Sequence, residues 1–487
     1  MNNLSDDILS SMFSYLMTST AILPPSLGDD PRLQLMAVSR RWRDVIFNSS
    51  NLWDTVIVLP RSPETSLELL MIASKWLEIR FVRDHVLSTF FLRPMYLNRQ
   101  GPRNRTRTGE IFRVLEDGFL PVARGTKSLS CTLSTDHGIQ SFFAIPPGTF
   151  GCLEKLNISL PSLPDQGLAH RTKTMIKDKL RTFTAFQNLR HLRSALINIS
   201  NGIHPLLLRI PWSQLTSLDM RSTRLRPNVF LEVLSASALS LKEGSFTIRF
   251  KRTRSTASAP QETFRIVKAR FLQYLRLRLI NPSRDKRFLF HLYLTALSHL
   301  KIDLDDRAGW RMWIYHRLLS RSSSTLRSLE FMDAPPQVPR RIDAVGHDLE
   351  GLFARCPNLE RLQLPIGVHM PQMTVNKIAE GSLLPYLRSL EVFSTVGIDI
   401  LEMVGRRNEL VYRRFGIGSS ELGSGTAAYA PFFAHVVLHT LLENRSNATL
   451  ARRYIRLFSS SQGTVFDFRF WVESNSRYTM IRLNSIG

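Results

Sequence analysis

Cysteine is scarce in this sequence of 487 residues, which contains three. Cys131, Cys152 and Cys356 are far apart, so they share none of the short spacings that bind a metal. An odd number of cysteines fits a reducing compartment, in which thiols stay free and are usually buried. The sequence therefore predicts three buried free thiols and no cysteine-based metal site.

Long hydrophobic runs are also missing. The longest candidate, residues 429–442, is too short to span a bilayer and is interrupted by Pro431, His435 and His439. The first three residues lack the positive charge of a secretory signal, and the apolar residues after them have amphipathic spacing. We therefore expect a soluble intracellular protein of the cytoplasm, the nucleus or both, without a membrane partner.

Common catalytic motifs are absent as well, including G-x-S-x-G, the Walker pattern and a Cys–His arrangement. His435 and His439 stand one helical turn apart, but a zinc peptidase would need glutamate at Val436 and a third ligand. We interpret them as residues on a helix surface. The glycine-rich segments at 416–418 and 423–425 lack a strand–helix context for binding phosphate. The sequence predicts no enzyme, no metal and no cofactor.

Lysine is rare among the basic residues, because 12 of the 64 are lysines. Residues 1–59 carry four basic and six acidic residues. The other 428 therefore carry 60 basic and 34 acidic residues, a net charge of +26. Such a basic body can attract nucleic acid, an anionic membrane or an acidic protein. Because the arginines are scattered, we expect mainly a solvated surface and no specific nucleic-acid partner.

The N-terminal stretch, in contrast, is densely apolar. Its spacing places six residues on one stripe of a first helix: Leu4, Ile8, Leu9, Met12, Phe13 and Leu16. Ser5 is placed to cap this helix. A second helix is predicted from Pro31 onward and carries Val38, and Ser39 is placed to cap a third helix with Trp42 on its inner face. Three short helices cannot bury all of these side chains, so we expect a partner to cover some.

The order of these blocks resembles an F-box domain. L-S-D-D-I-L, then V-S-R-R-W, then N-L-W is similar to the family pattern, with Ser5 at a common proline position and Ser39 at a common cysteine position. The family folds into three helices that dock on the Skp-family adaptor of cullin–RING ubiquitin ligases. The resemblance implies adaptor contacts by Leu4, Ser5, Ile8, Leu9, Val38, Ser39 and Trp42. Taken without the order of the blocks, the helices would be the core of any small helical domain.

A second pattern, a leucine followed by apolar residues three and five positions later, recurs along the body. It begins at Leu153, Leu215, Leu272, Leu297, Leu326, Leu359 and Leu387. A partial copy is predicted at Leu189-Leu192, a degenerate one at Leu241-Gly244-Phe246, and an earlier one at Leu129-Leu133. Self-similarity at roughly 25–35 residues is the signature of a solenoid, in which stacked units share one core. Return segments with helical spacing are predicted at 228–234 and 310–319.

The predicted fold is an α/β solenoid, with a three-helix F-box-like domain over residues 1–59. The segment Cys-Pro-Asn-Leu-Glu-Arg-Leu at 356–362 resembles a leucine-rich repeat of F-box proteins, including fungal ones. We therefore expect a leucine-rich-repeat-like horseshoe over 60–395. The repeat is predicted to fade after Val392, and residues 396–487 to form a cap with a helix and a β-hairpin. The basic segment 249–260 is predicted to be a solvated insertion.

The function implied by the resemblance is that of a non-catalytic substrate receptor of a Skp–cullin–F-box ubiquitin ligase. It would bind the Skp-family adaptor through the F-box, and through it a cullin. The repeats would bind a protein substrate, which the sequence does not identify. The alternative is a non-catalytic repeat scaffold that binds nucleic acid or an acidic protein through its arginines.

Overall fold

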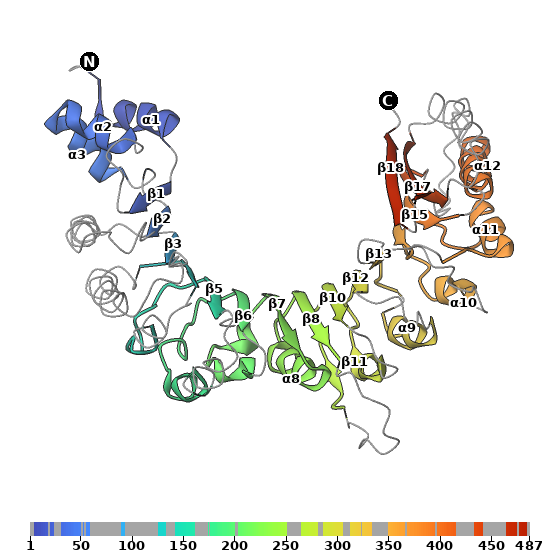
Figure 1. The fold of residues 1–487 in the computed structure, drawn as a ribbon, viewed down its shortest axis with the longest axis horizontal. Coiled ribbons are helices and arrows are strands. Elements are labelled where there is room, and N and C mark those ends of the chain that lie inside the picture. The colour runs from blue at the N-terminus through green and yellow to red at the C-terminus, as the bar shows by residue number, and fades with distance from the viewer. Residues whose placement is uncertain are drawn as a thin grey trace, which may run out of the picture. The chain divides into compact units, whose positions relative to one another are not determined.

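The computed structural model contains two compact units, Met1–Arg224 and Leu225–Gly487. It describes residues 4–17, 20–23, 31–49, 52, 55–58, 89–92, 125–132, 142–160, 174, 176–199, 203–250, 264–280, 286–304, 312–322, 324–333, 349–365, 368–394, 397–414, 433–441, 464–474 and 477–484. Figure 1 shows the helices and strands of both units. In each unit, parallel strands pair in the order of the sequence.

The first unit begins with three helices, α1 (Asp6–Leu16), α2 (Pro31–Val38) and α3 (Arg40–Asn48). Its strands are β1 (Thr20–Leu23), β2 (Thr55–Val58), β3 (Thr89–Leu92), β4 (Ser128–Thr132), β5 (Lys155–Leu160), β6 (Ser194–Ile199) and β7 (Ser217–Leu225). Each strand pairs in parallel with the next one. Two short 3-10 helices, η3 (Pro205–Leu207) and η4 (Trp212–Gln214), precede β7.

The second unit alternates strands with helices. Its helices are α8 (Pro227–Ser237), η5 (Lys286–His291), α9 (Met312–Leu319), α10 (Leu349–Ala354), α11 (Gln372–Ala379) and α12 (Ile398–Arg414). Its main sheet contains β8 (Glu243–Arg249), β10 (Tyr274–Ile280), β12 (His299–Leu304), β13 (Ser328–Asp333), β14 (Arg361–Gln363), β15 (Ser389–Phe393), β16 (His435–Leu441), β17 (Val465–Ser474) and β18 (Arg477–Asn484). Helices α9 to α12 lie on one side of these strands (Figure 1). A short parallel pair, β9 (Val267–Lys268) and β11 (Leu292–Tyr293), forms a separate small sheet.

Strands from β8 to β17 pair in parallel, and β18 pairs antiparallel with β17, as the hairpin signal predicts. Within a unit of the repeat, the apolar residues that define the pattern are buried: Leu297, Leu300 and Ile302 are each at most 1% exposed. Alternate side chains of a strand point to opposite faces, so the residues between them face outward. The core therefore lies between the strands and the helices.

A shared carbonyl fixes the register of neighbouring strands. The Ser298 carbonyl oxygen, just before β12, accepts hydrogen bonds from the backbone N–H groups of Arg327 at 2.8 Å and Ser328 at 2.9 Å. The same pair of bonds recurs at the carbonyls of Lys127, Glu154, Arg193, Lys242, Gln273, Arg327, Glu360 and Arg388. Because each repeat bonds to the next repeat in the same way, residues at equivalent positions of neighbouring repeats lie side by side along the edge of the strands.

This register corrects two of the repeat units predicted from the sequence. Ala195 pairs with Leu156, so the unit around β6 begins at Leu192, and the prediction that it begins at Leu189 is wrong. Leu129 pairs with Leu156 as well, from the other side, which makes it the second residue of its unit rather than the first. Alanine and threonine stand at leucine positions in these units, which hides the pattern in the sequence.

The parallel series also continues beyond Val392, where the repeat was expected to fade. Val436 of β16 pairs with Leu390 of β15, and Phe466 of β17 pairs with Val436. His435 and His439 are therefore strand residues, and the helix predicted for them is wrong. His439 is buried and not on a helix surface. The β-branched Val436 and Val437 between the two histidines favour a strand, a preference that the four-residue spacing concealed.

The return helices predicted at 228–234 and 310–319 correspond to α8 and α9. Other predictions lie outside the described residues, including the Asn-Leu-Trp motif apart from Leu52, most of the segment 249–260 and the glycine-rich segments at 416–425. The cysteines are free, but Cys152 is exposed, contrary to the prediction, while Cys131 and Cys356 are buried. Among the described helices, none combines the length and the apolar character needed to cross a membrane.

Candidate protein-binding surfaces

Helix α1 carries two apolar rows, not the single stripe predicted from the sequence. The inner row, Leu9, Phe13 and Met17, is buried. The outer row is exposed: Ile8 by 48%, Met12 by 43% and Leu16 by 64%. Both rows have a spacing of four residues, so each follows one line along the helix. The outer row is an apolar surface that the three helices do not cover.

The two serines predicted to contact the adaptor serve as helix caps. Ser5 Oγ accepts a hydrogen bond from the N–H of Ile8 at 3.4 Å, and Ser39 Oγ accepts one from Trp42 at 3.1 Å. A side-chain oxygen at this position satisfies an N–H group that would otherwise have no partner in the first turn. The caps fix where α1 and α3 begin.

Contacts between α1 and α3 position the outer row. The Phe13 and Trp42 rings meet edge to face, with centroids 5.0 Å apart. The Arg41 guanidinium donates to Asp6 Oδ1 from Nε at 3.0 Å and from Nη2 at 2.9 Å, and also bonds to the carbonyl of Leu4. Both charged side chains are substantially exposed, so the pair orients α3 more than it stabilises the unit.

A buried arginine, which the sequence did not reveal, joins α2 to the segment after α3. Arg32 is 2% exposed, and its Nε and Nη2 donate to the Leu52 carbonyl at 3.1 and 3.0 Å. Arg43 reaches the Met36 carbonyl at 3.4 Å. These bonds hold the three helices together where the apolar core is small.

The seven predicted contact residues therefore have different positions. Ile8 and Val38 are exposed, Val38 by 61%. Leu4 and Trp42 are half-buried, and Leu9 is a core residue of the helical unit. Met12 and Leu16, which the resemblance did not include, extend the exposed row. Met12 lies four residues after Ile8 and Leu16 eight, and this spacing had placed both on the stripe predicted from the sequence.

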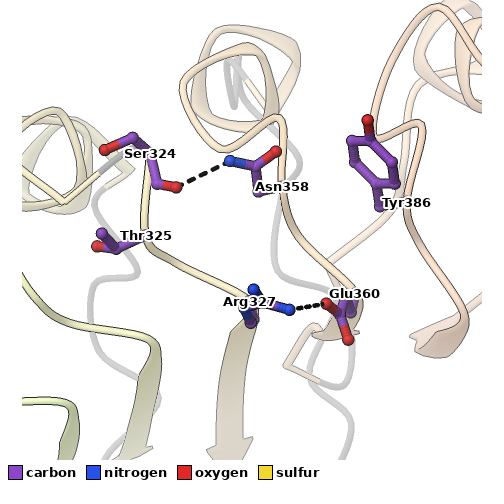
Figure 2. A pocket seen from close by; sticks show the side chains of 6 residues that line it. All are labelled: Ser324, Thr325, Arg327, Asn358, Glu360 and Tyr386. Carbon is purple, nitrogen blue, oxygen red and sulfur yellow. Dashed lines mark hydrogen bonds and ion pairs between the residues drawn. The ribbon is translucent and has the colours of Figure 1, made fainter. Parts of the chain in front are cut away.

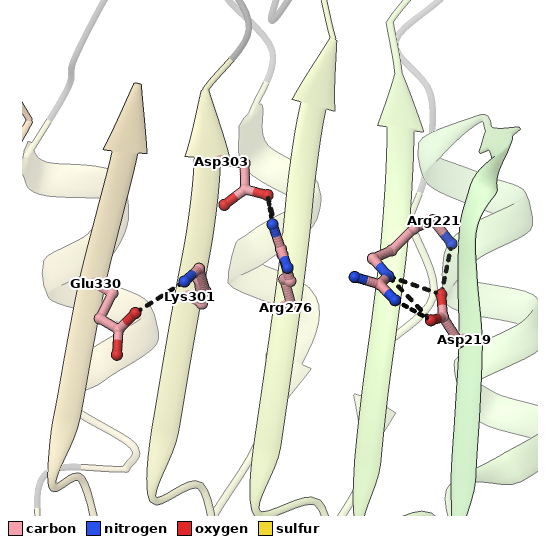
Figure 3. A network of polar contacts seen from close by, with 6 residues as sticks. All are labelled: Asp219, Arg221, Arg276, Lys301, Asp303 and Glu330. Atoms are coloured by element: carbon pink, nitrogen blue, oxygen red, sulfur yellow. Dashed lines mark hydrogen bonds and ion pairs between the residues drawn. The ribbon is translucent and has the colours of Figure 1, made fainter. Parts of the chain in front are cut away.

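Charged side chains on the outer face of the second unit's strands pair across neighbouring strands (Figure 3). Arg276 of β10 donates from Nε and Nη2 to Oδ2 of Asp303 on β12, at 3.0 and 2.6 Å. Lys301 Nζ donates to Oε2 of Glu330 on β13 at 3.0 Å. Each of these cations is neutralised by the adjacent strand, which leaves little net charge at these positions for a polyanion.

Glu330 is the centre of one such network. Its Oε1 accepts a hydrogen bond from Ser328 Oγ at 3.1 Å and lies 3.5 Å from Arg361 Nη1. Burial raises the pKa of Glu330, but the hydrogen bond and charge of Lys301, with Ser328 and Arg361, outweigh burial and hold the pKa below its usual value. The carboxylate is therefore ionised at neutral pH.

A second network joins β15, β16 and β17. Glu391 Oε1 lies 2.9 Å from His439 Nε2 and accepts a hydrogen bond from Arg469 Nη1 at 3.1 Å. Arg469 also bonds to Asp467 Oδ2 at 3.2 Å. In the described residues, no group of histidine, cysteine and carboxylate side chains could hold a metal ion.

Among the described side chains of the first unit, the outward residues of β4 to β7 include fewer charges. Asp219 and Arg221 of β7 pair with each other at 2.7 Å (Figure 3). Asn198 Nδ2 donates to Ser159 Oγ at 2.9 Å, from β6 to β5. These side chains are polar and bonded to one another, while Lys155 of β5 and Leu196 of β6 are exposed beside them.

An open pocket of ≈ 460 Å³ lies at the turns before β13, β14 and β15 (Figure 2). It is lined by Ser324, Thr325, Arg327, Asn358, Glu360 and Tyr386. Arg327 and Glu360 pair at 2.6 Å, and Asn358 donates to the Ser324 carbonyl at 2.8 Å. Because Arg327 and Glu360 neutralise each other, the pocket suits a neutral polar group better than an ion.

Comparison of the sequence with known protein families finds no family model that matches, and the search of curated proteins likewise finds no match.

Proposed function

We propose that this chain is the substrate receptor of a Skp–cullin–F-box ubiquitin ligase. In this proposal residues 1–59 are an F-box-like domain that binds the Skp-family adaptor, and through it a cullin. Residues 60–395 are a leucine-rich-repeat-like solenoid that binds a protein substrate, and residues 396–487 cap it. The chain performs no chemistry itself. It raises the concentration of its substrate near ubiquitin carried by another subunit.

The observation that carries the proposal is the exposed outer row of α1. A helix in a small unit normally turns its apolar residues inward, whereas Ile8, Met12 and Leu16 face outward beside a complete inner row. Val38, at the end of α2, is exposed as well. An apolar surface of this kind on an ordered helix is typical of a protein interface. The F-box resemblance is the reason for proposing the Skp-family adaptor as its partner.

The parallel strands and their recurring carbonyl bonds support the solenoid part of the proposal. Each described unit adds one strand beside the previous one and buries its apolar residues against its neighbours. Such an array offers a long row of outward side chains, which suits an extended protein substrate.

The test is isothermal calorimetry of the full chain with a purified Skp-family adaptor. Covering a half-exposed apolar side chain is worth about 1 kcal/mol. The double variant Ile8→Ala, Leu16→Ala is therefore expected to weaken binding by about 2 kcal/mol, roughly thirtyfold in Kd. Alanine is a good helix former, so α1 is retained.

Met373→Ala is the matched control, because Met373 is an exposed apolar residue on α11 of the second unit. It is expected to leave adaptor affinity unchanged. Equal affinity of the wild type and the α1 double variant, or no binding by the wild type, would refute the proposal.

A further inference from the structure

The second unit has a basic surface around the strand pair β9–β11. Val267 pairs with Leu292, Lys268 pairs with Tyr293, and the N–H of Ala269 donates to the Tyr293 carbonyl at 3.0 Å. Figure 1 shows β11 close to α9, on the helix side of the unit. The strand pair β9–β11 therefore holds β9 beside η5 and α9.

From Ile266 to Arg270 the side chains alternate between solvent and core, and Arg265 before them is exposed as well. Val267 and Ala269 are buried, whereas Arg265, Lys268 and Arg270 are exposed. The buried residues fix the segment, so the three cations project from an ordered backbone.

Two arginines of α9 and the turn after it extend this surface. Arg321 lies over the Tyr293 ring, with its guanidinium carbon 3.7 Å from the centroid, and its Nη1 donates to the carbonyls of Phe290 at 2.6 Å and Leu292 at 3.0 Å. Arg317 lies over the Phe290 ring at 5.0 Å. Stacking and carbonyl bonds hold the guanidinium planes in place, which lowers the entropy cost of binding an anion.

The basic surface consists of Arg265, Lys268, Arg270, Arg317 and Arg321. Within the part of the chain that the structure describes, none of the five forms a salt bridge, in contrast to the paired cations of the strand face. His291 lies beside them. Burial and the charges of Arg317 and Arg321 lower the pKa of His291, which indicates a positive potential at this place.

Two apolar side chains interrupt the charges. Ile266 and Phe271 are each 54% exposed, and they flank Lys268 and Arg270 in the sequence. A partner that matches this surface must supply negative charge and apolar side chains together. Nucleic acid provides phosphates and bases for stacking, but the rings of Tyr293 and Phe290 already have arginines over them, which leaves Phe271 for a base and gives the aliphatic Ile266 no match.

We propose that the basic surface, with Ile266 and Phe271, binds an acidic protein segment that carries apolar residues among its carboxylates. The guanidinium groups match carboxylates in geometry and charge. Apolar side chains of the partner would supply the water-excluding contacts, while the charges steer its approach and set its orientation. The proposal does not depend on the adaptor function of the N-terminal helices.

The test measures fluorescence anisotropy of the full chain with a labelled peptide of aspartate and glutamate that contains two Leu-Phe pairs. Reversing two charges, in Lys268→Glu with Arg270→Glu, is expected to weaken binding by about tenfold or more and to reduce its salt dependence. The control Arg190→Glu with Arg209→Glu makes the same change of net charge at two exposed arginines of the first unit. It is expected to retain the affinity of the wild type.

The apolar contribution is tested separately. Ile266→Ser with Phe271→Ser is expected to weaken the peptide several-fold and to leave the salt dependence unchanged, since no charge is removed. Circular dichroism and thermal melting verify that each variant is folded. Three results would overturn the proposal: no saturable peptide binding, equal losses in the two charge-reversal variants, or tighter binding of labelled oligouridine RNA that is lost in the Lys268 and Arg270 variant.

Discussion

Arg407 of α12 is a buried cation held entirely by backbone oxygens in the described structure. Its side chain is 1% exposed, and Nη1 donates to the Ile378 carbonyl at 3.0 Å. Nη2 donates to the carbonyls of Leu384 at 3.0 Å and Pro385 at 2.5 Å. The Phe433 ring lies 5.3 Å from the guanidinium carbon. Burial lowers the pKa of Arg407 to about 10, so the side chain remains charged at neutral pH.

We predict that Arg407→Ala destabilises the second unit by about 3–5 kcal/mol. Two buried carbonyls, of Ile378 and Leu384, and the part-buried carbonyl of Pro385 lose their donor, and each loss costs about 1–2 kcal/mol. Leu384 also has a φ of +50°, a left-handed conformation that is unfavourable for leucine. The bonds from Arg407 to the carbonyls of Leu384 and Pro385 hold this turn against α12. Without them the turn can relax and α12 can move away from it.

Arg406→Ala is the matched control on the same helix. Arg406 is exposed and forms one ion pair with Glu402 at 3.5 Å, four residues away. Its loss should cost less than about 0.5 kcal/mol. Urea unfolding gives the difference in stability, and hydrogen exchange of the segment 378–388 localises it. The reasoning is refuted if Arg407→Ala unfolds at the same urea concentration as Arg406→Ala, with unchanged exchange in this segment.

Two further predictions concern the strands of the second unit. The pKa of Glu330 is lower in the folded than in the unfolded chain, so its stabilisation is fully present above about pH 4.5 and is lost as the pH falls through the folded pKa. Glu330→Gln should remove this part of the pH dependence of urea unfolding and lower the free energy of unfolding by about 1–2 kcal/mol at neutral pH. A pH profile of unfolding equal to that of the wild type would contradict the network. Gly244→Ala should lower the free energy of unfolding by about 1–3 kcal/mol, because an added Cβ would lie 2.7 Å from the buried Phe246 ring. A thermal midpoint equal to that of the wild type would contradict this packing.

The helices of the N-terminal unit were accessible to sequence reasoning because their signals are local. The caps at Ser5 and Ser39 and the start of α2 at Pro31 each depend on residues within one turn. The division of α1 into a buried and an exposed row was not accessible. Both rows are apolar and equally spaced, and only the packing of Trp42 on Phe13 decides which row is inside.

The repeats were predicted correctly where leucine occupies the positions that define the pattern. Where another residue stands at such a position, the predicted start of the repeat was wrong. Ala195 and Gly244 occupy positions that leucine holds in other units. At Gly244 the missing side chain is replaced by the Phe246 ring, which packs on Phe230 with centroids 5.0 Å apart. A pattern search scores each position separately, whereas the core requires only that the volume be filled.

Arginine illustrates the limit of inference from composition. Sequence statistics place arginine on the surface, which is correct for Arg270. Arg32 and Arg407 are instead buried against carbonyl oxygens that turns distant in the sequence bring to them. Arg276 is held by a carboxylate one strand away. Whether an arginine is exposed, buried or paired depends on which polar atoms the tertiary structure places beside its guanidinium. The net charge of +24 therefore does not measure the charge open to a partner, and its exposed, unpaired part has to be located residue by residue.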